Sequence, residues 1–172
     1  MEEVLATFKA EAFRNAIRLY RDACILYASA SYPSAFALGV LSYEELGKVH
    51  RIDRVCDAMC LNPEGRAEFY GWITSGNLLT DHKQKQISAL LETSPGRLHD
   101  PRGRFVVGGG LDQAKQQALY VDLQDDKVLT PTRITREKAY AQLQECLSAL
   151  EGCDDLGFNG FECASTPKSE WL

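Results

Sequence analysis

The chain has 172 residues, of which 45% are hydrophobic, and it carries a formal net charge of −5 with a pI of about 5.2. This length and composition fit one globular domain with a buried core and exclude a disordered chain. The acidic balance argues against a surface coated in basic charge, although a local basic groove needs only a few cations. The acidic amino-terminal segment has no apolar stretch, and no long apolar run follows it, so we expect a cytoplasmic protein without a membrane span.

Three long helices are predicted in the first half of the chain. Apolar residues recur at steps of three and four over residues 2–31 and again over 33–59, which is the period of an amphipathic helix. Pro33 separates these two segments, since proline restricts the residue before it and suits the first turn of a new helix. Asn62-Pro63 ends the second segment, and a third helix is expected over residues 64–92. The short connections predict antiparallel neighbours in a bundle.

The second half of the chain is predicted to contain a long loop and shorter helices. Residues 93–110 are rich in glycine, proline and arginine, which predicts one long basic loop with a short extended piece at 105–107. Shorter helices are expected over 111–121 and 135–150, the second of them capped by Thr135. The fold class is therefore all-α, an antiparallel bundle of about five helices. Residues 1–152 are expected to form a single domain, and residues 153–172 a C-terminal tail.

The six cysteines do not have the spacing of a disulfide framework, and we interpret them as reduced thiols. Cys56 and Cys60 are four residues apart and could share a helix face, as metal ligands do. No nearby histidine or second cysteine pair completes a zinc site, so no metal is expected there.

A polar segment interrupts the second helix at Glu44-Glu45-Leu46-Gly47-Lys48. Glu45 falls on the apolar stripe, where a carboxylate is costly unless it is paired or hydrogen-bonded. Lys48 lies one turn from Glu44 and Glu45 and can neutralise either. A helical glycine such as Gly47 costs about 0.5–1 kcal/mol relative to alanine and usually signals the close approach of another backbone or a ligand. The alternative is an ordinary surface pair of Glu44 with Lys48, with Glu45 at the edge of the core.

A second polar cluster follows in the third predicted helix, at Asp81-His82-Lys83-Gln84-Lys85. Antiparallel packing would lay it beside the second helix. The pKa of a histidine lies near neutrality, which suits proton transfer, and the neighbouring lysines could contact an anion. A lone histidine is more often structural than catalytic. Its position opposite the Glu44–Lys48 segment makes His82 the better candidate.

Two further motifs have weaker interpretations. Arg97, Arg102 and Arg104 make the 93–110 segment basic, so it either holds RNA phosphates or is a surface loop without a role. A carboxylate-bridged metal centre could use Glu44, Glu45 and His82, but it would need a second Glu-x-x-His pair, which the sequence does not contain.

These pieces, in this order, resemble the AbiV branch of the HEPN superfamily. The similarity is carried by Tyr32-Pro33-Ser34-Ala35, the segment Leu41–Lys48, His82-Lys83-Gln84-Lys85 and the segment Ala118–Asp122. It extends over roughly residues 10–150. The resemblance implies a compact helical bundle that is often a homodimer, with an active site in the cleft between the two copies. Many relatives are metal-independent endoribonuclease toxins that shut down translation during phage infection.

The resemblance implies the following roles, with no metal and no cofactor. His82 would be the general acid or base, and Glu44, Glu45 and Lys48 a charged network that orients it. Lys83, with Lys48 as a second candidate, would contact the scissile phosphate. The expected partners are RNA, a second copy of the chain, and a phage protein or an antitoxin. The RNA-binding residues would be Lys85, Arg97, Arg102 and Arg104.

The chain departs from the wider superfamily at one place. HEPN ribonucleases usually carry an arginine and a histidine separated by four to six residues, and none of His50, His82 and His99 has an arginine at that spacing before it. Either His82 and the Glu44–Lys48 segment replace the usual pair, or the domain is non-catalytic and binds a phage protein, a nucleotide or a partner enzyme.

Overall fold

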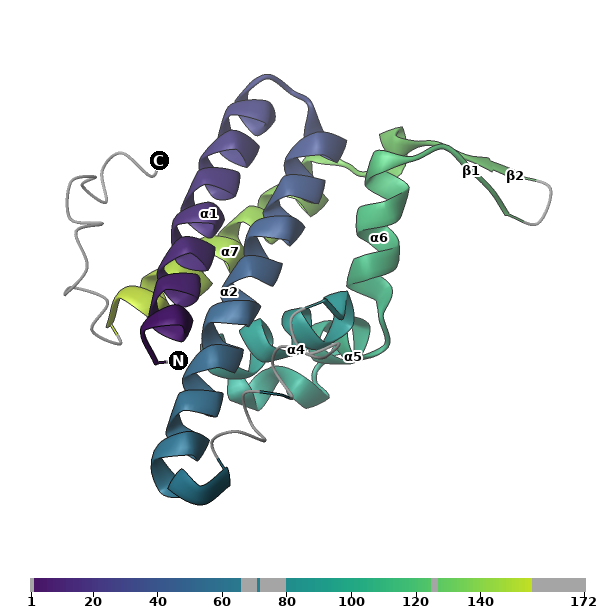
Figure 1. Ribbon diagram of the computed structural model, residues 1–172. Coiled ribbons are helices and arrows are strands. Elements are labelled where there is room, and N and C mark those ends of the chain that lie inside the picture. The colour runs from purple at the N-terminus through teal and green to yellow at the C-terminus, as the bar shows by residue number, and fades with distance from the viewer. Residues whose placement is uncertain (1, 66–70, 72–79, 125–126, 156–172) are drawn as a thin grey trace.

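The computed structural model describes residues 2–65, 71, 80–124 and 127–155. Within these residues the chain forms six α-helices, three short 3-10 helices and one two-stranded antiparallel sheet, labelled as in Figure 1. None of the helices in this part of the chain combines the length and the apolar character needed to cross a bilayer. The helices are α1 (Glu2–Ala28), α2 (Tyr32–Leu61), α4 (His82–Thr93), α5 (Pro101–Val107), α6 (Gly110–Leu119) and α7 (Arg136–Asp155).

Helices α1 and α2 form a long antiparallel hairpin (Figure 1). The turn between them is closed by hydrogen bonds from the Ala30 and Ser31 backbone N–H groups to the carbonyls of Tyr27 and Leu26, with Ala30 in the left-handed region at φ 58°. Small residues such as Ala16 and Ala37 are completely buried and let the two helices pack closely. Both helices lie close to the predicted bounds.

Helix α2 is the central element, since it packs against α1, α4, α6 and α7. Figure 1 shows α7 passing behind α1 and α2, while α6 lies on the side of α2 away from α1. Leu143, Cys146 and Leu150 of α7 belong to the main core. Because helices cover α2 on several sides, it buries polar as well as apolar positions, and these positions hold the candidate site. The prediction of an all-α antiparallel bundle is confirmed.

Two predicted details are wrong. The helix expected over 64–92 is not continuous: Pro63–Gly65 is a 3-10 helix, and α4 starts afresh at His82, where the Asp81 side chain accepts a hydrogen bond from the Gln84 backbone N–H at 3.0 Å. Residues 66–70 and 72–79 of that expected helix lie outside the described residues, as does most of the expected tail, 156–172.

The expected long basic loop is instead mainly helical. Residues 95–99 form a 3-10 helix, and residues 101–107 form α5, so the extended piece expected at 105–107 is also wrong. The Asp100 side chain caps α5 by accepting from the Gly103 backbone N–H at 2.7 Å. That bond, and after it the Arg97 guanidinium, hold the pKa of the Asp100 carboxyl below its usual range.

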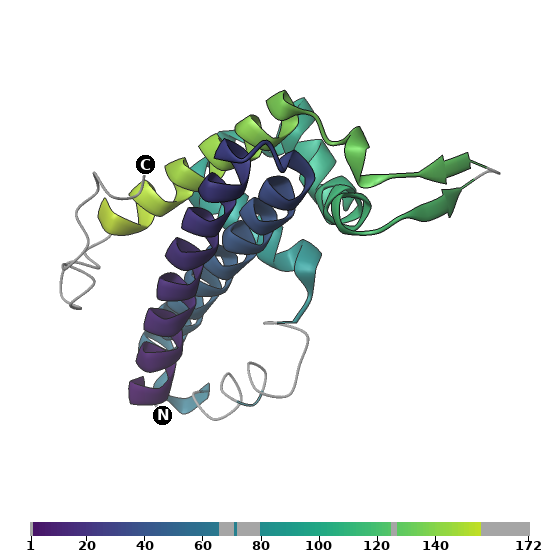
Figure 2. The same cartoon turned by 90° about the horizontal axis from the view of Figure 1, so that it is seen from above.

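A short hairpin projects from the body between α6 and α7 (Figures 1 and 2). Its strands are β1 (Asp122–Gln124) and β2 (Lys127–Leu129), and the backbone of Asp122 lies opposite that of Leu129. Leu129 is buried and anchors the base of the hairpin, whereas Val128 is exposed. The 3-10 helix Pro131–Arg133 then leads into α7.

Candidate functional site

Glu44 is the buried carboxylate of α2, with only 2% of its surface exposed. The sequence stripe had placed Glu45 on the buried face, which is wrong. Glu45 is only partly buried and pairs with Lys48, its Oε1 lying 2.6 Å from the lysine Nζ. A single stripe misjudges α2 because α4 and α6 cover a second face of this helix, and Glu44 points into that face.

Four side chains surround the Glu44 carboxylate. Lys115 Nζ and Gln86 Nε2 donate to Oε1 at 2.7 and 2.8 Å. His82 Nδ1 lies 2.6 Å from Oε2, and Lys85 Nζ lies 3.5 Å from the same oxygen. Burying a carboxylate is tolerable only with such compensation, because an unpaired buried charge costs several kcal/mol. We call this set of residues, together with Asp112, the Glu44 centre.

Gly47 is what lets α4 approach α2 at this point. A Cβ atom built on Gly47 would lie 1.9 Å from the carbonyl oxygen of Lys85, so only glycine fits. The close approach of another backbone, which the sequence predicted from this glycine, is confirmed. It brings the first turns of α4, which carry His82, Lys85 and Gln86, onto Glu44. The amino-terminal end of a helix favours a negative charge, so α4 itself helps to stabilise the carboxylate.

Helix α6 contributes a cation, Lys115, that was not predicted from the sequence. Lys115 has a side chain only 3% exposed, and its Nζ lies 2.7 Å from Glu44 Oε1 and 2.8 Å from Asp112 Oδ1. A signal for it was present in the sequence. Lys115 stands four residues after Leu111 and three before Ala118, both of them buried, so it occupies the apolar face of α6 as Glu44 does that of α2.

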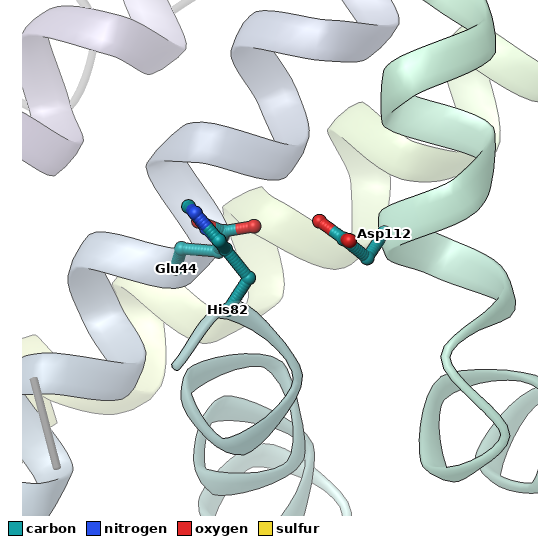
Figure 3. Close-up of side chains that lie close together, drawn as sticks. All are labelled: Glu44, His82 and Asp112. Carbon is teal, nitrogen blue, oxygen red and sulfur yellow. The ribbon is translucent and has the colours of Figure 1, made fainter. Parts of the chain in front are cut away.

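Three side chains of the Glu44 centre carry atoms of the kinds that bind metal ions. Ligand atoms of Glu44, His82 and Asp112 all lie within 4.8 Å of one another, and Figure 3 shows them converging from α2, α4 and α6. Lys115 Nζ, however, lies among them, 3.2 Å from His82 Nδ1 as well as close to both carboxylates. An ammonium group there neutralises the carboxylates and repels a second cation. These residues therefore do not fit a divalent metal ion.

His82 is the open member of the centre, with half of its side chain exposed. Beside two ammonium groups Glu44 is a carboxylate, which only accepts hydrogen bonds, so Nδ1 is the nitrogen that carries the proton and donates to Oε2. In the neutral imidazole Nε2 then keeps a lone pair. A histidine held by a carboxylate through one nitrogen, with the other free to exchange a proton, is the arrangement used in general acid–base catalysis.

Two lysines of α4 differ in their surroundings. Lys85 is buried, and burial lowers the pKa of its ammonium group, while the Glu44 carboxylate opposes that shift. Lys83 is exposed on the first turn, next to His82 in the chain. Lys85 therefore neutralises the Glu44 carboxylate, whereas the ammonium group of Lys83 is open to solvent. Glu45 and Lys48 lie near enough to Lys85 to shift its pKa, upward and downward respectively.

The three arginines expected to bind RNA lie elsewhere and interact within the chain. Arg97 Nε donates to Asp100 Oδ2 at 2.9 Å, and Arg104 donates to the His99 carbonyl at 2.6 Å. Arg102 binds α7, with 2.5 Å between its Nη2 and Glu145 Oε2. The structure thus gathers Glu44, His82 and Lys85 and leaves these arginines outside the centre.

The fold and the site define a class of protein: a mainly helical domain in which one buried carboxylate binds a half-exposed histidine and two buried lysines. The family model HEPN_AbiV, described as AbiV, matches residues 4–148. The chain therefore belongs to the AbiV family of HEPN proteins, and this membership associates it with abortive infection. No curated protein and no solved structure matches it.

Proposed function

We propose that this protein is an abortive-infection endoribonuclease that needs no metal ion and shuts down translation in the cytoplasm of the infected cell. The observation that supports this most is the 2.6 Å contact between His82 Nδ1 and the buried Glu44 carboxylate, which leaves Nε2 of a half-exposed ring for chemistry. Membership of the AbiV family also supports an abortive-infection function.

The proposed reaction is cleavage of an RNA phosphodiester by its own ribose. His82 Nε2 takes the proton of a 2′-hydroxyl, the 2′-oxygen forms a bond to phosphorus, and the bond from phosphorus to the 5′-oxygen breaks. The 5′-oxygen leaves with a proton that the protonated His82 of a second copy of the chain donates, so the products are a 2′,3′-cyclic phosphate and a 5′-hydroxyl. Lys83 contacts the phosphate, whose charge grows in the transition state. Glu44 is a positioning residue, since it holds the imidazole in the required tautomer.

A homodimer completes this proposal, because one histidine cannot be both the base and the acid in the same step. A second copy of the chain would place another His82 beside the first, on the opposite side of the phosphate. This predicts that the active species is dimeric and that activity falls on dilution below the dimer dissociation constant.

The test is cleavage of a defined RNA by the purified protein in EDTA. His82→Ala is expected to lower the rate by about 10²–10⁴-fold, the usual contribution of a general acid or base. Glu44→Gln should lower it too and alter the pH–rate profile, because the imidazole loses its anionic partner. The matched control is His99→Ala, since His99 is exposed and lies outside the Glu44 centre. Equal rates for His82→Ala and His99→Ala would overturn the assignment.

The second candidate function is a non-catalytic domain that binds a phage protein, a nucleotide or a partner enzyme. It is favoured by the missing arginine before each histidine and by the neutralisation of Glu44 within the chain. It predicts no RNA turnover by wild type under any condition, with a defined partner retained on the immobilised protein during infection. Turnover that depends on His82 excludes it.

A further inference from the structure

The β-hairpin between α6 and α7 carries exposed apolar side chains on a projecting element (Figures 1 and 2). Val121 and Val128 are 68% and 66% exposed, and Tyr120 is 61% exposed. We call Tyr120, Val121 and the two strands the hairpin arm. The backbone of Leu123 lies opposite that of Val128, and Val121 stands two residues before Leu123, so strand alternation places both valines on one face. Leu129, on the other face, is buried.

A hairpin arm of this kind is not expected to be stable in water without a covering partner. Among the residues that the structure describes, the sheet has only β1 and β2, so each strand has one open edge. A single two-stranded hairpin is marginally stable at best in water, and open edges beside exposed apolar side chains favour association with another chain. We infer that a second copy of the chain covers the arm, and that the two copies exchange arms, each arm lying in a groove of the other copy.

The groove that fits the arm has a volume of about 580 Å³ and lies between α5, α6 and α7. Its apolar lining consists of Phe36, Phe105, Ala114, Ile134 and Ala141. Phe105 is 41% exposed, so part of this lining is in contact with water. Packing the valines and the tyrosine of the arm against these side chains would remove apolar surface of both copies from water, which is favourable.

The arm and the groove carry opposite charges. Residues 120–129 contain three aspartates and one lysine, which gives a formal charge of −2. The groove has three cations and one carboxylate, which gives +2: Arg102, Arg133, Lys138 and Glu145. Arg102 is already paired with Glu145, its Nη2 lying 2.5 Å from Oε2. Arg133 and Lys138 are exposed, and neither forms an ion pair with any described residue. These two cations favour an acidic partner segment.

The place where the arm leaves the helices favours a second copy over an unrelated partner. Gln117 and Arg133 line the groove, and they lie four residues before Val121 and four residues after Leu129. The arm therefore starts beside the groove of its own chain, but it points away from the helices and leaves that groove open (Figure 1). A twofold axis beside this point would place each arm on the groove of the other copy, in one self-complementary interface. An unrelated protein on the arm would leave the complementary groove without an occupant.

This interface differs from the one proposed for RNA cleavage. Gln113 and Gln117 of the groove project from the opposite side of α6 to Lys115, and none of the residues of the Glu44 centre lines the groove. Arm exchange therefore does not supply the second His82 of the proposed reaction, and it does not depend on ribonuclease activity. If both interfaces form, pairs joined by their arms assemble into larger particles.

Analytical ultracentrifugation of the full chain tests the inference. Val121→Lys with Val128→Lys removes the apolar face of the arm and brings positive charge to the basic groove. The particle mass should fall to half the wild-type value, and the dissociation constant should rise at least about tenfold. Arg133→Glu with Lys138→Glu should have the same effect from the side of the groove. The control is Val4→Lys with Ile25→Lys, two exposed positions of α1, which should leave the mass unchanged.

Mixing the two double variants distinguishes a lost contact from a lost fold. In a mixed pair, the unaltered arm of the groove variant meets the unaltered groove of the arm variant. The other arm brings its new lysines to the new glutamates, which attract them. The mixture should therefore regain the wild-type mass, which two misfolded proteins would not do.

Three results would overturn the inference. One is a wild type that stays monomeric throughout the micromolar range. Another is an arm variant with the mass of wild type, which would show that an unrelated partner, or none, covers the arm. The third is a mixture of the two double variants that does not reassemble. Loss of RNA cleavage in all of these proteins, with arm exchange intact in wild type, would contradict the proposed function alone.

Discussion

His50 and His82 have the same side chain but lie in different surroundings. His50, in α2, is 3% exposed, and its Nε2 lies 3.4 Å from the Sγ of Cys153. Burial lowers the pKa of His50 and raises that of Cys153 to about 12, so both groups are neutral and form a packed polar contact. His82 is half exposed and is bound to an ionised carboxylate. A histidine becomes suited to proton transfer through a charged partner and an open nitrogen, not through burial.

The largest expected effect on stability concerns the ion pair behind His82. Lys115→Met removes the cation nearest to Glu44 and leaves a buried carboxylate with weaker compensation. The free energy of unfolding, measured by urea denaturation, should fall by about 3 kcal/mol. Glu44→Gln combined with Lys115→Met removes both charges but leaves the buried Lys85 without a carboxylate partner, so it should regain only part of that loss. A cost for Lys115→Met no greater than that of Lys127→Met, on the exposed face of β2, would show that the region around His82 does not depend on this pair.

The next effect tests how the backbone holds the His82 region together. Gly47→Ala places a Cβ atom against the Lys85 carbonyl and forces α4 away from α2. We expect a loss of about 1–3 kcal/mol in unfolding free energy, the usual cost of overpacking. The matched control is Gly152→Ala in α7, where a Cβ atom meets nothing within 4 Å. That variant should be neutral or gain up to about 1 kcal/mol. Similar effects for both glycines would contradict the role given to Gly47.

The bundle could be predicted from the sequence because long helices carry a strong periodic signal, and α1 and α2 end within a few residues of their expected bounds. The predicted loop over 93–110 failed for a physical reason. Asp100-Pro101 is a helix start, because a capping side chain is followed by proline in the first turn. The glycines and prolines around it favour a loop, and this stronger signal made the prediction wrong.

The candidate site could be predicted only in part. His82 and the Glu44–Lys48 segment were found from their charge on apolar helices, and Gly47 correctly indicated close backbone approach. Which glutamate is buried depends on how many helices cover α2, which one-dimensional periodicity does not record. Lys115 is 71 residues from Glu44 in the chain, and only the tertiary fold joins them.

The buried His50 should make the free energy of unfolding depend on pH. Because burial lowers the pKa of His50 from its ordinary value of 6.5, the unfolded chain binds a proton more readily than the folded one. This contribution to stability is fully present above pH 6.5 and is lost as pH falls from there toward the folded pKa. The extra slope is at most about 1.4 kcal/mol per pH unit for one group. Unfolding free energies at pH 7 and pH 5 should differ less in His50→Gln than in wild type. An unchanged pH dependence would contradict the neutral, buried His50.

The smallest effect distinguishes Glu44 from its neighbour in the chain. Lys48 pairs with Glu45 at 2.6 Å, but both side chains keep contact with water, at 20% and 16% exposure. Lys48→Met should therefore cost no more than about 1 kcal/mol in unfolding free energy, because partly exposed pairs are screened by solvent. Its effect on RNA cleavage should stay below about tenfold, since Lys48 acts on the centre only through the charge felt by Lys85. A loss of cleavage as large as that of His82→Ala, in a protein of unchanged stability, would instead place Lys48 at the phosphate. The site proposed for proton transfer by His82 would then extend one turn further along α2, toward His50.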